Sequence, residues 1–76
     1  MAIKSYLAFP HEGQKEALVD SIESISGCEV TPSENRDLLI LIIESKDQNH
    51  EEKLLEEIKN LNSLNHLTLV SGFNDN

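Results

Sequence analysis

The feature that most constrains this chain is an unbroken aliphatic run, residues 38–43, in which all six side chains are leucine or isoleucine. An apolar run of this length is typical of a buried β-strand, and it falls well short of the roughly 20 residues that a membrane span needs. Successive side chains along a strand point to opposite faces of a sheet. This strand therefore supplies aliphatic side chains to both faces.

The rest of the sequence predicts three further strands and two helices around this run. Strands are expected at residues 3–9, 28–32, 37–44 and 66–71, and helices at residues 14–25 and about 49–60. Gly27 has the usual position of a helix stop, and Pro32, which cannot donate to a ladder, puts the second strand at a sheet edge or ends it. Asn49 followed by Glu52 resembles a capping box at the start of the second helix.

The expected order of elements is β-α-β-β-α-β, the ferredoxin-like arrangement of an α+β protein. Right-handed crossovers place both helices on one face of a four-stranded antiparallel sheet and leave the other face uncovered. We expect one such domain over residues 1–73 and a polar C-terminal tail over residues 74–76.

The strands flanking the aliphatic run indicate which side chains reach the uncovered face. Lys4 is a poor core residue, so Lys4 and every second residue after it in the first strand are expected to face outward. The expected inward set is Ile3, Leu7, Phe9, Leu67 and Leu69, and the expected outward set is Lys4, Tyr6, Ala8, Thr68 and Val70. The pattern leaves open which triplet of the aliphatic run lies outward: Leu38, Ile40 and Ile42, or Leu39, Leu41 and Ile43.

Either triplet creates a contiguous apolar patch, and such patches usually mark contact surfaces. Each aliphatic side chain contributes roughly 1.5–3 kcal/mol when buried. A bound polypeptide and a face-to-face homodimer explain the patch equally well on physical grounds. A third interpretation, sheet propensity alone, is weaker because exposed aliphatic runs promote aggregation.

Charge and cysteine content restrict the partners and the compartment. Fourteen Asp and Glu residues against six Lys and Arg residues give a formal net charge of −8. Such a chain repels phosphate backbones and attracts basic partners, so no nucleic-acid partner is expected, although acidity also serves solubility. The single cysteine, Cys28, excludes an internal disulfide and fits a reducing compartment. With no signal-like or membrane-spanning segment recognised, we expect a cytoplasmic protein without membrane insertion.

The sequence contains no pattern that predicts catalysis, a metal or a cofactor. His11, His50 and His66 are far apart, and no C-x-x-C motif occurs. Cys28 has no matched base beside it in the sequence, and the glycines form no phosphate loop. Paired glutamates on the second helix are expected to be solvated. We therefore expect no catalytic, metal-binding or cofactor-binding residues, and no enzyme activity.

Several segments, in their order and spacing, resemble NapD-type chaperones. Three features recur in that family: a first strand that contains a serine, a G-C-E-V segment after the first helix, and an apolar third strand that ends in a glutamate. The matching segments are Ile3-Lys4-Ser5-Tyr6-Leu7, Ile25-Ser26-Gly27-Cys28-Glu29-Val30, residues 38–43 with Glu44, and Leu64 with Leu67-Thr68-Leu69-Val70. The resemblance spans nearly the whole chain.

This resemblance implies a ferredoxin-like fold and a cytoplasmic, non-enzymatic chaperone for the catalytic subunit of a periplasmic nitrate reductase. The family holds the client's twin-arginine signal peptide as a helix on the sheet and delays export until the molybdenum cofactor is loaded. The expected state is a monomer or weak homodimer. The residues expected to bind the peptide are Tyr6, Ala8, Leu39, Leu41, Ile43, Thr68 and Val70. Lys4, on the same expected face, would repel the arginines unless it lies at the rim.

Two functions from other classes fit the same fold. A ferredoxin-like small-molecule-binding or dimerisation domain requires a stable dimer and a pocket with fixed polar groups. An acylphosphatase-like enzyme requires an arginine and an asparagine around a phosphate, and the sole arginine, Arg36, is poorly placed for that role.

Overall fold

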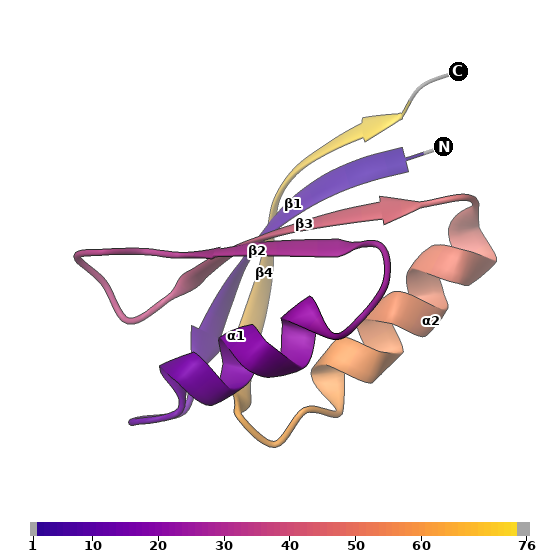
Figure 1. Ribbon diagram of the computed structural model, residues 1–76. Coiled ribbons are helices and arrows are strands. Elements are labelled where there is room, and N and C mark those ends of the chain that lie inside the picture. The colour runs from indigo at the N-terminus through magenta and orange to yellow at the C-terminus, as the bar shows by residue number, and fades with distance from the viewer. Residues whose placement is uncertain (1, 75–76) are drawn as a thin grey trace.

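The computed structural model describes the backbone of residues 2–74 and the side chains of residues 2–70. The elements in chain order are β1 (Ala2–Pro10), α1 (Lys15–Glu23), β2 (Cys28–Pro32), β3 (Leu39–Ser45), α2 (Gln48–Lys59) and β4 (Leu64–Asn74) (Figure 1). The strands form one antiparallel sheet in the order β2-β3-β1-β4, and both helices lie on the same side of it. The predicted ferredoxin-like fold is confirmed.

The first helix is shorter than the sequence pattern predicts, ending at Glu23 with Ser24 as its C-cap. The chain then turns onto β2 through Gly27, whose φ of +92° is a left-handed conformation that side chains with a Cβ avoid. The Gly27 carbonyl accepts a hydrogen bond from the Glu44 amide at 2.9 Å. A Cβ at Gly27 would lie 3.1 Å from the Glu44 carbonyl oxygen. Gly27 therefore serves the close approach of this turn to β3.

The second helix is capped by Asp47, so the expected capping box at Asn49 is wrong. The Asp47 carboxylate accepts a hydrogen bond from the His50 amide at 2.8 Å. The Nδ1 atom of His50 accepts one in return from the Lys46 amide at 3.0 Å. This reciprocal pair satisfies two backbone donors at the helix start, and Asn49 lies inside the first turn instead.

The last strand runs further than expected, through residue 74, so the predicted tail boundary is wrong at that residue. Phe73 lies opposite Ile3, and Asn74 lies opposite Ala2. Residues 75–76 of the expected tail lie outside the described residues. Between Ser5 and Tyr6 the register of β1 with β4 shifts, so that Val70 is an extra residue without a partner in the pairing.

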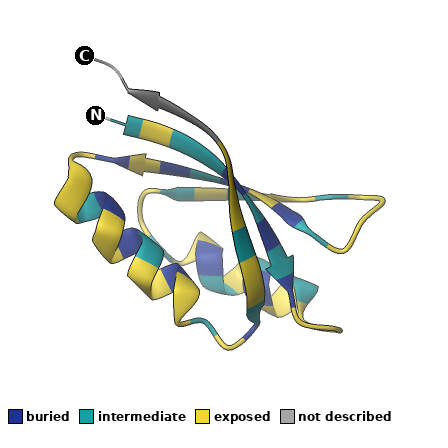
Figure 2. Cartoon of the chain, turned by 180° about the vertical axis from the view of Figure 1, so that it is seen from behind, coloured by how far each residue is buried: buried dark blue, intermediate teal, exposed yellow. Residues whose placement is uncertain are grey.

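The core lies between the sheet and the two helices, and buried positions alternate with exposed or partly buried ones along β3 (Figure 2). Its buried apolar members are Tyr6, Ala8, Leu18, Ile22, Leu39, Leu41, Ile43, Leu54 and Ile58. Leu67 packs against this cluster, whereas Leu69, opposite Tyr6, is 56% exposed.

The expected parity of the first strand is wrong, because Lys4, Tyr6 and Ala8 lie on the helix side and Ile3, Leu7 and Phe9 on the other. Five residues expected on the uncovered face are therefore core residues: Tyr6, Ala8, Leu39, Leu41 and Ile43. The physical reason is that Lys4 finds a partner on the helix side, Glu51, 2.5 Å from its ammonium group. A paired lysine at the end of a sheet is tolerated where an unpaired one is not.

Candidate functional site

The candidate site is the face of the sheet opposite the helices, which we call the open face. The cross-strand register fixes its members, because paired residues point to the same side. Among residues 2–70, whose side chains the structure describes, the members are Ile3, Ser5, Leu7 and Phe9 of β1, Glu29 and Thr31 of β2, Ile40, Ile42 and Glu44 of β3, and His66 and Thr68 of β4.

The open face has an apolar centre and a polar rim. Among its described members, the five large apolar residues lie on the two central strands, β1 and β3: Ile3, Leu7, Phe9, Ile40 and Ile42. Ile3 is 41% exposed and Ile40 is 44% exposed, while the other three are partly buried by their neighbours. We call these five residues the apolar strip. An apolar centre with polar edges is the usual composition of a protein interface.

The rim along β4 contains a small polar group beside an aromatic ring. The Thr68 hydroxyl lies 2.9 Å from Nε2 of His66, and the His66 ring lies 5.6 Å from the Phe9 ring, tilted by 37°. Thr68 thus lies on the open face, as predicted. Val70 is 57% exposed at the bulge of β4.

The opposite rim, where β2 begins beside the end of β3, is acidic. A hollow of about 380 Å³ there is lined by Ile3, Gly27, Cys28, Glu29, Ile42 and Glu44. Both carboxylates are exposed, whereas the Ile42 side chain between them is partly buried. The hollow continues the apolar strip, because it shares Ile3 and Ile42 with it.

On the helix side, Glu51 joins β1 to the first turns of α2. Its Oε1 atom lies 2.5 Å from the Lys4 ammonium and 3.5 Å from the Tyr6 hydroxyl, which donates a long hydrogen bond. The hydrogen bond to Glu51 raises the pKa of Lys4, and burial, reinforced by the Glu51 charge, raises the pKa of Tyr6. Since Lys4 is engaged here, its charge is absent from the open face.

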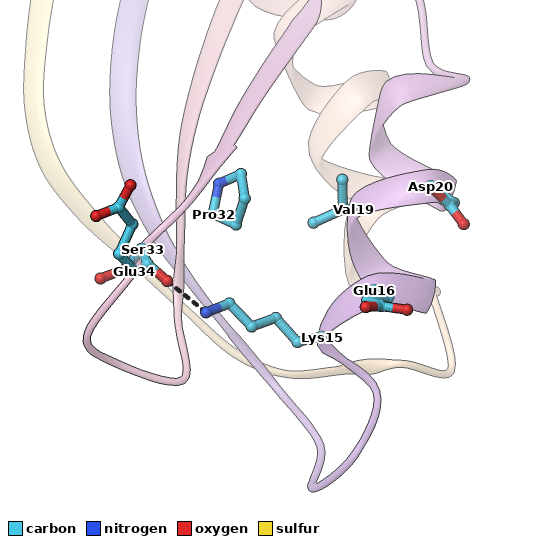
Figure 3. A pocket seen from close by; sticks show the side chains of 7 residues that line it. All are labelled: Lys15, Glu16, Val19, Asp20, Pro32, Ser33 and Glu34. Carbon is cyan, nitrogen blue, oxygen red and sulfur yellow. Dashed lines mark hydrogen bonds between the residues drawn. The ribbon is translucent and has the colours of Figure 1, made fainter.

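A second hollow, of about 560 Å³, lies between α1 and the turn that joins β2 to β3 (Figure 3). Its Lys15 ammonium donates to the carbonyl oxygen of Ser33 and, at 2.9 Å, to that of Arg36. The lysine therefore holds the turn in place. The remaining polar side chains of this hollow are Glu16, Asp20, Ser33 and Glu34.

Burial lowers the reactivity of the Cys28 thiol. Burial, with a smaller effect of the Glu57 charge, raises the pKa of the Cys28 thiol to about 11, so the thiol is neutral near pH 7 and a weak nucleophile. Among residues 2–74, no three His, Cys, Asp or Glu side chains lie close enough to hold a metal ion. None of the described helices is long and apolar enough to cross a membrane.

Sequence reasoning missed the apolar strip because it chose the wrong parity. The signal that could have found it is Glu44, which shares its parity with Ile40 and Ile42 in the aliphatic strand. In β2, Glu29 and Thr31 likewise alternate with the half-buried Cys28 and Val30. A charged residue that shares the parity of one triplet marks that triplet as the one facing solvent.

Comparison with known proteins identifies one family and one fold. The family model described as NapD protein matches residues 1–72. Among solved structures, the solution structure of the E. coli Tat proofreading chaperone protein NapD is similar, with a TM-score of 0.81 and 19% sequence identity. The match covers 96% of this chain and 78% of that chain. A search of curated proteins found no significant match to the sequence.

Proposed function

Because the chain belongs to the NapD protein family, we propose that it is a cytoplasmic chaperone that binds a twin-arginine signal peptide on its open face and catalyses no reaction. The observation that carries this proposal is the apolar strip on a sheet face that no helix covers. The similar E. coli protein is described as a Tat proofreading chaperone, and this supports the same role here.

The proposed client is the catalytic subunit of a periplasmic nitrate reductase. By holding its signal peptide, the chaperone would delay export until the molybdenum cofactor is loaded. The chain itself needs no cofactor for this role, because masking an export signal requires only affinity for the peptide.

The dimensions of the apolar strip suit a helical peptide. From Ile3 to Phe9 the strand extends by about 20 Å, at roughly 3.3 Å per residue. A helix rises by about 1.5 Å per residue, so roughly 13 helical residues span the strip. An amphipathic helix laid on an apolar surface is a recurrent mode of peptide recognition, and the net charge of −8 attracts the basic start of a signal peptide.

We assign the peptide contacts to Ile3, Leu7, Phe9, Ile40 and Ile42. Thr68 and Val70 stay in the proposed site, because both are exposed on the strand beside the strip. The buried residues Tyr6, Ala8, Leu39, Leu41 and Ile43 shape the sheet beneath it without touching the peptide.

Calorimetric titration with a twin-arginine signal peptide tests the proposal, with a twin-lysine variant of the peptide for comparison. Ile40→Asp should weaken binding at least roughly tenfold, because a charge would then face the apolar helix. Leu69→Asp is the matched control: Leu69 is also an exposed aliphatic residue, but it lies outside the open face. An absence of binding to the unaltered chain would remove the chaperone function.

The apolar strip also supports a second candidate, a dimerisation domain in which two open faces pack together. In that case Ile40→Asp would convert a dimer to a monomer in sedimentation experiments, and the unaltered chain would ignore the signal peptide.

A further inference from the structure

We infer that the open face binds its peptide in one orientation, with the basic residues in the acidic hollow at the start of β2 and the apolar helix running from there toward His66 and Thr68. This inference rests on the proposed function and adds to it the polarity of the peptide and the residues that impose it.

The lining of the hollow has the chemistry that an arginine side chain requires. Glu29 lies opposite Ile42, and Glu44 lies opposite Ile3, so the two carboxylates border two aliphatic side chains. An arginine buries its hydrocarbon stem on apolar surface and presents a planar fork of donors to carboxylates. Gly27 leaves the side of the hollow free of a side chain.

The two carboxylates are available to an incoming cation. Among the residues that the structure describes, the one salt bridge joins Lys4 to Glu51 on the helix side. Neither Glu29 nor Glu44 belongs to it, and the described members of the open face include no lysine or arginine. A basic peptide therefore meets unneutralised negative charge at this corner.

Among the described members of the open face, none at the opposite corner is a carboxylate. Its polar residues are His66 and Thr68, which lie opposite Phe9 and Leu7. A peptide bound in reverse would place its arginines beside the Phe9 and His66 rings, where no anion of the open face compensates them. The asymmetry of charge along the apolar strip thus favours one direction over the other.

Orientation is measured directly by NMR on the unaltered protein. A twin-arginine signal peptide carries a nitroxide at its amino end, attached through a maleimide so that the label does not exchange with Cys28. We expect the label to broaden the amide signals of Glu29 and Glu44 and to spare those of His66 and Thr68. Broadening of the His66 and Thr68 signals instead would overturn the inference.

Matched charge variants give an independent test. Glu29→Gln with Glu44→Gln should weaken binding about tenfold, since each exposed ion pair contributes up to about a factor of five. Glu52→Gln with Glu56→Gln removes the same net charge from exposed positions of α2 and should change affinity less than about twofold. Equal affinities of the two double variants would overturn the inference alone. A peptide that fails to bind the unaltered protein would overturn the proposed function, and the inference with it.

Discussion

The Lys4 ammonium lies 2.5 Å from the Oε1 atom of Glu51, on the side of the sheet that the helices cover. This contact joins the first strand to the start of α2. It directs the Lys4 side chain toward the helices, although lysine side chains are usually exposed to solvent. The pair allows Lys4 to share the parity of Tyr6 and Ala8, which are buried in the core.

Replacing Glu51 should therefore destabilise the fold. Glu51→Ala leaves Lys4 unpaired and removes the acceptor of the Tyr6 hydroxyl, so we expect Tm to fall by roughly 4–8 °C. The double variant Lys4→Met with Glu51→Leu should recover most of that loss, because an apolar pair replaces the ion pair and leaves no unpaired charge. Differential scanning calorimetry measures both. An unchanged Tm for Glu51→Ala would mean that the pair is incidental.

The two parities of β3 should respond differently to truncation. Leu41 is fully buried and Ile40 is 44% exposed. Leu41→Ala should lower the free energy of unfolding by about 2–5 kcal/mol, whereas Ile40→Ala should lower it by about 1 kcal/mol or less. Urea denaturation followed by circular dichroism measures the difference. Similar losses for the two variants would indicate that both faces of the strand are covered.

The start of α2 offers a test of the observed cap. Asp47→Ala should cost about 1 kcal/mol, because the His50 amide loses its acceptor. His50→Ala should cost less, since only the bond from the Lys46 amide is lost. Asn49→Ala, inside the first turn, is the control and should be nearly neutral. Chemical denaturation of the three variants ranks them, and a loss at Asn49 equal to that at Asp47 would contradict the observed cap.

Cys28 should make stability depend on alkaline pH. Its folded pKa of about 11 exceeds the ordinary value of 9.0, so the folded state retains a proton that the unfolded chain releases. The stabilisation is complete below about pH 9 and is lost as the pH rises toward 11. Cys28→Ala should lack this component, while Tyr6 titrates in both proteins. Iodoacetamide labelling gives a second readout: its rate should have a midpoint near pH 11 in the folded protein and near 9 in urea.

The element order and the architecture could be predicted from the sequence. The aliphatic run at residues 38–43, the helical spacing of Leu54 and Ile58, and Gly27 are local signals, and they indicate the ferredoxin-like fold together. The observed ends of α1 and β4 differ from the predicted ends by one to three residues. Terminal turns depend on which side chain reaches which amide, as the Asp47 cap demonstrates.

The local sequence signals for the open side of the sheet conflict, since Glu44 favours Ile40 and Ile42 as outward residues and Lys4 favours the opposite parity, and the tertiary structure decided between them. In the aliphatic run both parities are equally apolar, so burial energy alone is indifferent between them. Lys4 favoured the wrong parity, in which Lys4 itself faces the open side. Its partner Glu51 is distant in the sequence, and the two residues meet only when α2 packs on the sheet. Local patterns therefore determined that an apolar face exists. The packing of two helices against the other side, which the long-range pair of Lys4 and Glu51 accommodates, left Ile3, Leu7, Phe9, Ile40 and Ile42 on that face.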